Sequence, residues 1–178
     1  MATPRTARAV ELVSATPAQT FGLGARLAAV AGPGDLVCVW GDLGAGKTVF
    51  AKGFGQGLGV DETVSSPSFI LMAEHPGRLR LFHLDLYRLT NAGEAVAGGL
   101  LDERQADGVT LVEWPDRMGP TLPPERLDVR IAGLGDEPRH IRLETEVPSL
   151  GRYLDAALEV GDAERPAAED ATAGREGR

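Results

Sequence analysis

The sequence predicts an α/β fold whose mixed sheet has parallel core strands and antiparallel flanking strands. Leu36 to Trp40 is a continuous apolar run bounded by turn residues, which is typical of a buried parallel strand. A glycine-rich segment and a helical pattern follow it, as they do in the units that build parallel sheets. Two later segments, 127–131 and 140–144, alternate apolar and polar residues, which indicates antiparallel strands with one solvated face.

Each predicted element has a local signal. Thr16-Pro17-Ala18-Gln19 has the form of a capping box, so we expect a helix from 17 to about 30. A turn at 32–35 precedes the strand at 36–40, and Ser66-Pro67 precedes an apolar run at 69–72 that indicates a strand. The other predicted elements are a helix from 47 to about 58, strands at 79–85 and 109–113 with a helix at 94–101 between them, and a helix from 149 to about 160.

Three glycines, Gly53, Gly55 and Gly57, fall inside the helix predicted from residue 47. Each costs roughly 0.5–1 kcal/mol relative to alanine in a helix. Two interpretations stay open, the general glycine richness of the chain and close packing of this helix on the sheet.

The length of 178 residues suggests one domain, which we expect to span residues 9–160. Residues 1–8 are expected to be frayed. Residues 161–178 contain no valine, isoleucine, leucine, methionine or aromatic residue. Such a tail buries too little apolar surface to offset the entropy of ordering, so it is expected to be disordered.

Composition favours a cytoplasmic protein that does not bind nucleic acid by itself. The net charge of −8 argues against phosphate contacts over a broad surface, because these need clustered cations. No apolar run approaches the roughly 20 residues of a membrane span, so no membrane association is expected. The single cysteine, Cys38, excludes an intramolecular disulfide framework.

The segment Gly41-Asp42-Leu43-Gly44-Ala45-Gly46-Lys47-Thr48 matches the pattern G-x-x-x-x-G-K-[ST] of a phosphate-binding P-loop. Its glycines allow a tight turn in which backbone N–H groups point inward around an anion, through to Val49 at the start of the helix. The Lys47 ammonium is expected to reach the β- and γ-phosphates of ATP, and the Thr48 hydroxyl to bind Mg²⁺. The strand before and the helix after give the motif the context of a P-loop NTPase fold.

Two acids follow apolar strands downstream of this loop. Asp85 ends the strand at 79–85 and Glu113 ends the strand at 109–113. Strand ends of a parallel core meet at the edge where such sites open, so one acid is expected to hold Mg²⁺ and the other to orient the attacking water. Asp85 as a helix cap or surface partner of Arg88, and Glu113 as a solvated strand end, stay open as alternatives.

Neighbouring residues give weaker signals. His83 is interpreted as a strand histidine rather than a base, and Tyr87 and Arg88 as contacts either to a partner or to the phosphates. Trp40 and Trp114 flank the predicted site, although packing in the core explains them equally well. The loop Ser65-Ser66-Pro67-Ser68 is either ordinary or a switch that responds to the γ-phosphate.

Together these motifs resemble the bacterial TsaE (YjeE) family of ATPases from about residue 16 to residue 140. The block His83-Leu84-Asp85-Leu86-Tyr87-Arg88-Leu89, followed by Leu111-Val112-Glu113-Trp114-Pro115, is far more specific than the phosphate loop alone. The resemblance implies a P-loop sheet with antiparallel flanking strands. It implies ATP hydrolysis that supports formation of threonylcarbamoyladenosine at position 37 of tRNA, together with the TsaD–TsaB complex, and contact with tRNA only through that complex.

The resemblance also implies roles for single residues. Lys47 would contact phosphate, Thr48 and Glu113 would bind Mg²⁺, Asp85 would serve hydrolysis, and Trp114 would lie beside the nucleotide. Two positions depart from the family pattern. Ser68 stands where threonine is frequent and keeps the hydroxyl, whereas His75 lies where the family usually has a tyrosine, which puts a stacking or partner role there in doubt.

Three other functions are open to a chain with a phosphate loop. A small-molecule kinase would need an acceptor pocket and a cationic lid. No arginine-rich lid segment lies between the motifs, although Arg78, Arg80 and Arg88 could serve that purpose. A GTPase commonly carries an N-K-x-D segment, whereas the only asparagine, Asn91, is followed by alanine. A non-catalytic module that binds ATP to assemble a complex is poorly separated from an ATPase by sequence.

Overall fold

The computed structural model describes residues 7–68, 70–99 and 101–159. The tail predicted from residue 161, and all but the last two residues of the N-terminal segment 1–8, lie outside these ranges. Arg8, which the sequence assigned to that frayed segment, is instead the first residue of a strand.

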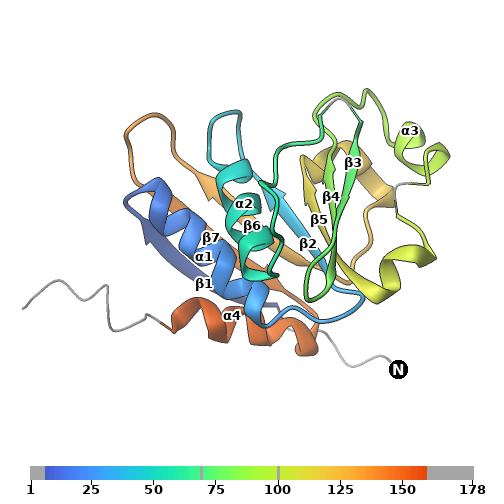
Figure 1. The fold of residues 1–178 in the computed structure, drawn as a ribbon. Helices are drawn as coiled ribbons and strands as arrows, with labels where there is room; N and C mark the ends of the chain where they lie inside the picture. The colour runs from blue at the N-terminus through green and yellow to red at the C-terminus, as the bar shows by residue number, and fades with distance from the viewer. Residues whose placement is uncertain (1–6, 69, 100, 160–178) are drawn as a thin grey trace, which may run out of the picture.

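One seven-stranded sheet forms the centre of the described structure (Figure 1). Its spatial order is β1-β7-β6-β2-β5-β4-β3. Neighbouring strands are parallel from β6 through β2 and β5 to β4, and antiparallel at β1–β7, β7–β6 and β3–β4. The strands are β1 (Arg8–Ser14), β2 (Leu36–Trp40), β3 (Met72–His75), β4 (Arg80–Asp85), β5 (Gly108–Glu113), β6 (Leu127–Ala132) and β7 (Arg139–Thr145). The predicted parallel core with antiparallel flanks is confirmed.

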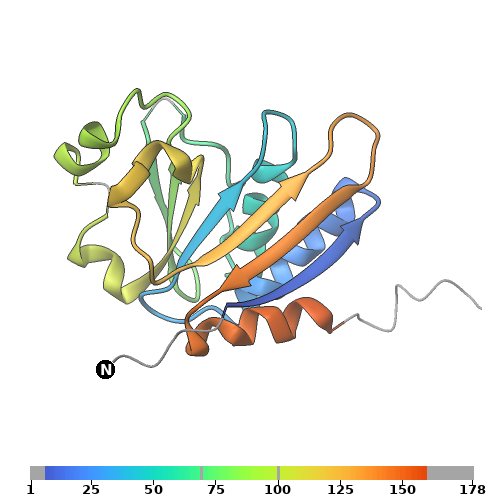
Figure 2. The same ribbon diagram turned by 180° about the vertical axis from the view of Figure 1, so that it is seen from behind.

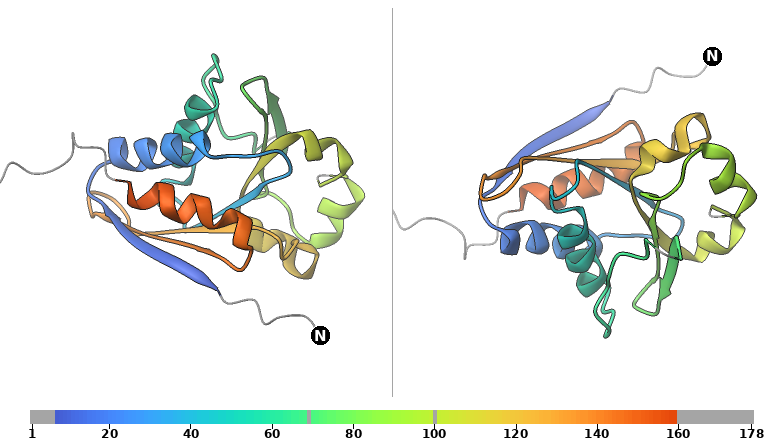
Figure 3. Two further views of the ribbon diagram at one scale, coloured as in Figure 1. Left: turned by 90° about the horizontal axis from the view of Figure 1, so that it is seen from below. Right: turned by 90° about the horizontal axis from the view of Figure 1, so that it is seen from above.

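Helices α1 (Pro17–Ala29) and α2 (Lys47–Gly57) lie side by side on one face of the sheet, and α4 (Gly151–Leu158) crosses its lower end (Figures 1 and 3). The view from behind shows the other face of β6, β7 and β1 (Figure 2). The short α3 (Ala92–Ala97) and the 3₁₀ segments Glu103–Asp107 and Pro115–Thr121 lie beyond β4 and β5.

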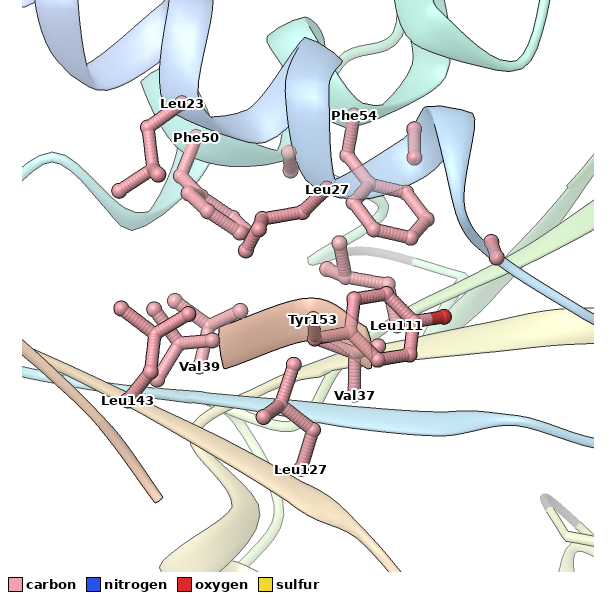
Figure 4. Close-up of a cluster of buried hydrophobic side chains, with 14 of the residues drawn as sticks. Leu23, Leu27, Val37, Val39, Phe50, Phe54, Leu111, Leu127, Leu143 and Tyr153 are labelled. Carbon is pink, nitrogen blue, oxygen red and sulfur yellow. The ribbon is translucent and has the colours of Figure 1, made fainter. Parts of the chain in front are cut away.

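The main core fills the space between the helices and the sheet (Figure 4). Leu27 of α1 and Phe50 and Phe54 of α2 point from above, each fully buried. Val37 and Leu111 face them from β2 and β5. A second cluster on the opposite face includes Leu84, Val112 and Met118. Because both faces of the central strands are covered, the sequences of β2 and β5 are largely apolar and do not alternate.

The cap of α1 agrees with the sequence. Thr16 Oγ1 accepts a hydrogen bond from the Gln19 amide at 3.2 Å, and the Gln19 side chain accepts one from the Ala15 amide at 2.6 Å. Such a cap satisfies backbone donors that the first helical turn leaves without partners.

The strand predicted at 69–72 is wrong. The chain turns there instead, with the amides of Ile70 and Leu71 both donating to Pro67 O, and Leu71 has a positive φ of 65°. The strand β3 begins only at Met72. Ile70 is 69% exposed, so this apolar run does not mark a buried element. Phe69 lies outside the described residues.

Smaller differences concern the predicted helix ends. The helix expected at 94–101 is α3, which begins at Ala92 and ends at Ala97, and the helix expected at 149–160 is α4, with a 3₁₀ turn before it. No element was predicted at 9–15, where β1 pairs antiparallel with β7. The alternation of Val10 and Leu12 with polar residues is the signal that identifies this strand.

Two of the three glycines of α2 pack against helix α1. A Cβ atom on Gly53 would overlap the carbonyl group of Phe21, and one on Gly57 would lie 2.8 Å from Ala25 Cα. The third, Gly55, packs on the other side, where a Cβ would overlap the side chain of Val64 and lie 3.6 Å from that of Leu81 in β4. The close-packing interpretation is therefore supported, with the neighbouring helix as the partner at two positions and the side chains of Val64 and Leu81 at the third.

Candidate functional site

The phosphate loop joins the end of β2 to the start of α2. Gly44 and Gly46 have positive φ angles of 83° and 106°, which a side chain would strain. Gly46 is the N-cap of α2, and no side chain caps this helix, in contrast to Thr16 at α1. The first N–H groups of α2 are thus left for an anion, at the positive end of the helix dipole.

Lys47 lies folded across this loop. Its side chain donates hydrogen bonds to Gly41 O at 2.7 Å and Asp42 O at 2.8 Å, and Nζ lies 3.8 Å from the centre of the Trp114 ring. Burial lowers the pKa of the Lys47 ammonium, and the Glu113 and Asp85 carboxylates oppose that effect. The cation therefore rests among dipoles and a ring face that stabilise it.

Glu113 connects the loop to the neighbouring strand. Its Oε2 accepts a hydrogen bond from the Thr48 hydroxyl at 3.0 Å, and its Oε1 lies 2.8 Å from His83 Nε2. Glu113 is 1% exposed, which excludes the alternative of a solvated strand end. His83 is fully buried, and its Nδ1 has no hydrogen-bond partner among the described residues. The interpretation of His83 as a strand histidine fits this position, where the ring holds one carboxylate oxygen and leaves the other to Thr48.

Asp85 lies at the end of β4, beside Glu113 in the parallel register. Its Oδ2 accepts hydrogen bonds from the hydroxyls of Ser66 and of Ser68, the latter at 2.8 Å, and its Oδ1 accepts one from the Tyr87 amide at 3.0 Å. The serine loop is therefore attached to the predicted site, which argues against an ordinary loop. Asp85 caps a turn through Tyr87 while its other oxygen faces the serines.

Trp114 closes one side of the site. Its backbone is left-handed, with φ 60° and ψ 49°, and its ring centre lies 5.0 Å from that of Tyr87. A residue other than glycine in this conformation costs on the order of 1–3 kcal/mol, and such strain clusters at functional sites. Trp40 lies elsewhere, with its indole N–H donating to Asp128 at 2.8 Å, so it does not flank the site.

Most of the predicted site residues meet in one pocket of about 340 Å³. Asp42 and Gly41 contribute through their carbonyl groups, and Ala45 lines the adjoining pocket. The residues that line the first pocket are Leu43, Gly44, Gly46, Lys47, Thr48, Val49, Ser66, Ser68, Asp85, Tyr87, Glu113 and Trp114.

A second pocket of about 280 Å³ adjoins the phosphate loop on the side of α1. Its walls are the start of α1 around Thr16 and Thr20, the loop residues 44–46, and the turn 135–137 between β6 and β7. Arg139, at the start of β7, lines it as well and bonds to the phosphate loop. Arg139 was not predicted from the sequence, because no local motif contains it.

The two positions that depart from the family pattern have different surroundings. Ser68 keeps the hydroxyl contact to Asp85. His75 is buried in β3, where its Nδ1 lies 2.7 Å from Glu62 Oε1, and it does not line the pocket of the phosphate loop.

The described residues contain neither a cluster of metal-binding side chains nor a helix that could span a membrane. No group of three or more histidine, cysteine, aspartate or glutamate side chains among them is arranged to hold a metal ion. Within the same residues, every helix is too short or too polar to cross a membrane.

Several known proteins are similar to this chain over most of its length. A curated relative named tRNA threonylcarbamoyladenosine biosynthesis protein TsaE, from Bacillus subtilis, is 43% identical over 126 residues, which are 70% of this chain and 78% of that protein. The protein of the same name from Streptomyces coelicolor is 40% identical over 126 residues, 67% of this chain and 85% of its own length. A crystal structure of Bacillus subtilis YdiB superposes with a TM-score of 0.68 at 32% identity, covering 85% of this chain and 95% of that one.

The family model described as threonylcarbamoyl adenosine biosynthesis protein TsaE matches residues 14–141. This range holds the phosphate loop, both acids and the serine loop. The chain therefore belongs to the TsaE family and has its P-loop NTPase fold.

Proposed function

We propose that this chain is a Mg²⁺-dependent ATPase that supports formation of N6-threonylcarbamoyladenosine at position 37 of tRNA. The observation that carries the proposal is the hydrogen bond between Thr48 of the phosphate loop and the buried Glu113, 65 residues apart in sequence. A phosphate loop and an acid that meet in this way are the two halves of a magnesium–nucleotide site.

The residues present fit Mg²⁺. The ion prefers hard oxygen ligands and usually takes only one or two from the protein, with phosphates and water completing its shell. The Thr48 hydroxyl and a Glu113 oxygen are such ligands, and no larger carboxylate or histidine cluster is formed by the described residues. When bound, Mg²⁺ would neutralise charge that develops on the phosphates.

Lys47 and the start of α2 supply the rest of the phosphate contacts. The ammonium group, now bonded to two carbonyl oxygens of the loop, would exchange these for phosphate oxygens with little movement of its stem. The uncapped N–H groups of α2 would donate to the same anion. The Lys47 ammonium and the N–H groups of α2 would interact most strongly with the phosphate oxygens on which negative charge develops during phosphoryl transfer.

Asp85 is suited to orient the attacking water. One of its oxygens is held by the Tyr87 amide, and the other faces the serine hydroxyls at the wall of the pocket. Because two serines share that oxygen, their loop would respond to whatever displaces them, which is the behaviour expected of a switch segment.

The pocket beside α1 offers room for the nucleoside part of ATP. It shares Gly44, Ala45 and Gly46 with the phosphate loop, and apolar residues of its lining alternate with the polar side chains of Ser14, Thr16, Thr20, Asp136, Glu137 and Arg139. A flat ring between a helix start and a turn, next to bound phosphates, is a common arrangement for a nucleotide.

The names of the relatives support a role in one pathway. Proteins of this family are named for threonylcarbamoyladenosine biosynthesis on tRNA, and we propose that the present chain acts there in the cytoplasm with a TsaD–TsaB-type complex. Its net charge of −8 favours contact with tRNA through the complex rather than directly.

The test is Mg-ATP hydrolysis by the chain alone and with its cognate TsaD–TsaB pair. The sequence offers a matched control, because Lys47 and Lys52 are its only lysines and Lys52 is exposed on the same helix. Stimulation by the pair that Lys47→Ala abolishes and Lys52→Ala preserves would support the site and the pathway. Hydrolysis that the pair does not affect would keep the P-loop ATPase but reopen the alternatives of a small-molecule kinase and an assembly module.

A further inference from the structure

One arginine joins the phosphate loop to the turn between β6 and β7. Arg139 Nε donates to Ala45 O at 2.9 Å, and Nη2 lies 3.5 Å from Gly44 O. The same guanidinium donates to Gly135 O at 3.0 Å and to Glu137 O. All four acceptors are backbone carbonyl groups, two from each loop, so a single planar group connects the two segments.

The contact with Ala45 fixes a particular peptide plane. In a trans peptide the C=O and the following N–H point in opposite directions. Since Ala45 O faces Arg139, the Gly46 N–H points away from it. The preceding plane is held as well, because the Ala45 amide donates to Asp42 O at 3.0 Å.

Without the bond to Arg139, the Ala45–Gly46 peptide plane would be easy to rotate. Gly46 has a φ of 106°, and glycine adopts positive and negative φ with similar ease, so nothing in its own side chain holds the orientation. Lys47 bonds to the carbonyl groups of Gly41 and Asp42 at the other end of the loop and leaves Ala45 O to Arg139.

We propose that Arg139 is a positioning residue that holds the Ala45–Gly46 peptide so that the Gly46 N–H faces a phosphate oxygen of the bound nucleotide. The inference rests on the proposed function, since it assumes that the anion lies in the phosphate loop. Arginine is suited to this task because its five N–H donors lie in one rigid plane, whereas a lysine at this place would offer one rotatable ammonium.

A purely structural alternative is that Arg139 only supports the turn between β6 and β7, through Gly135 and Glu137. The two possibilities predict different effects of an Arg139 substitution on the phosphate loop. If Arg139 positions the peptide, its loss loosens residues 44–46 and weakens phosphate binding. If it only supports the turn, the phosphate loop is unaffected.

The experiment compares the wild-type chain, Arg139→Lys and Arg139→Met, with Arg142→Lys as a matched control. Arg142 lies on the same strand but pairs with the side chains of Glu144 and Glu11. The first readout is the NMR order parameter of the Gly46 amide in the nucleotide-free protein, because this N–H shares a peptide plane with Ala45 O. The second is the affinity for Mg-ADP by calorimetry. We expect a lower order parameter at Gly46 and about tenfold weaker binding in both Arg139 variants, and neither change in the control.

The outcomes separate the inference from the proposed function. An unchanged order parameter at Gly46 would overturn the inference, even if ADP binding fell, because Arg139 would then act on the ligand directly. Failure of the wild-type chain to bind ADP would overturn the proposed function, and the order parameters would still decide whether Arg139 holds the peptide. Should Arg139→Met not fold, Arg139→Lys, which keeps the charge and most of the length, carries the comparison.

Discussion

The close contact between α1 and α2 predicts how Gly53→Ala changes the stability of the protein. Alanine is the better helix former by roughly 1 kcal/mol, so propensity alone predicts a more stable protein. The structure predicts the opposite. The new Cβ would lie 2.7 Å from the Phe21 carbonyl carbon and 2.9 Å from its Cα, closer than such atoms approach. Since these are backbone atoms, no rotamer change relieves the overlap.

The helices would have to separate by on the order of 1 Å, which also loosens the layer around Leu27 and Phe50 beneath them. Overpacking of this kind costs typically 1–3 kcal/mol and occasionally more. Subtracting the propensity gain from the upper part of that range leaves a loss of about 2 kcal/mol in the free energy of unfolding.

The assay is urea-induced unfolding followed by circular dichroism, with Gly22→Ala as the control. Gly22 is also inside a helix, but a Cβ there would meet only the mobile end of Arg26, at 3.9 Å. Gly22→Ala is therefore expected to raise stability by roughly 0.5–1 kcal/mol. Equal shifts of the two variants in the same direction would refute the reasoning, because close helix contact would then not be what selects Gly53.

Three further predictions concern the site, the pH response and the cap. Glu113→Ala should raise the Mg²⁺ concentration needed for half-maximal ATP turnover more than it weakens nucleotide binding, and an unchanged Mg²⁺ dependence would point to Asp85 as the ligand. A hydrogen bond from Arg130 lowers the pKa of Glu144, so this carboxylate stabilises the fold above its unfolded pKa of about 4.3, and the contribution disappears as pH falls through the lower folded value. Glu144→Gln should then lower the urea midpoint at pH 7 but not at pH 2, and an equal loss at both would show that charge is irrelevant. Thr16→Ala should cost about 1 kcal/mol of unfolding free energy, and no loss would mean that solvent satisfies the Gln19 amide equally well.

The parts of the structure that follow from local rules could be predicted from the sequence. The capping box placed the start of α1, and the apolar run followed by Gly41 placed β2 and the phosphate loop. These signals depend on residues a few positions apart, where sterics and hydrogen bonding of the chain with itself decide the conformation.

The parts that depend on distant pairing could not be predicted. The apolar run around Ile70 resembled a strand, yet the turn after Pro67 exposes the Ile70 side chain. Where the strand begins is decided by the pairing of β3 with β4, which starts at Met72. The role of Arg139 requires knowing that β7 returns beside the phosphate loop. Likewise, the contact of Ser66 with Asp85 joins segments 19 positions apart.

The order of strands in the sheet has a consequence for synthesis of the chain on the ribosome. The phosphate loop is complete by residue 48, but the acid that meets it ends β5 at Glu113, and the strand on its other side, β6, ends at Ala132. Arg139 leaves the ribosome later still. If the proposed function holds, a nascent chain would carry the whole phosphate-binding motif while the next 65 residues are still being added, and ATP could stabilise the protein only after Glu113 has been made.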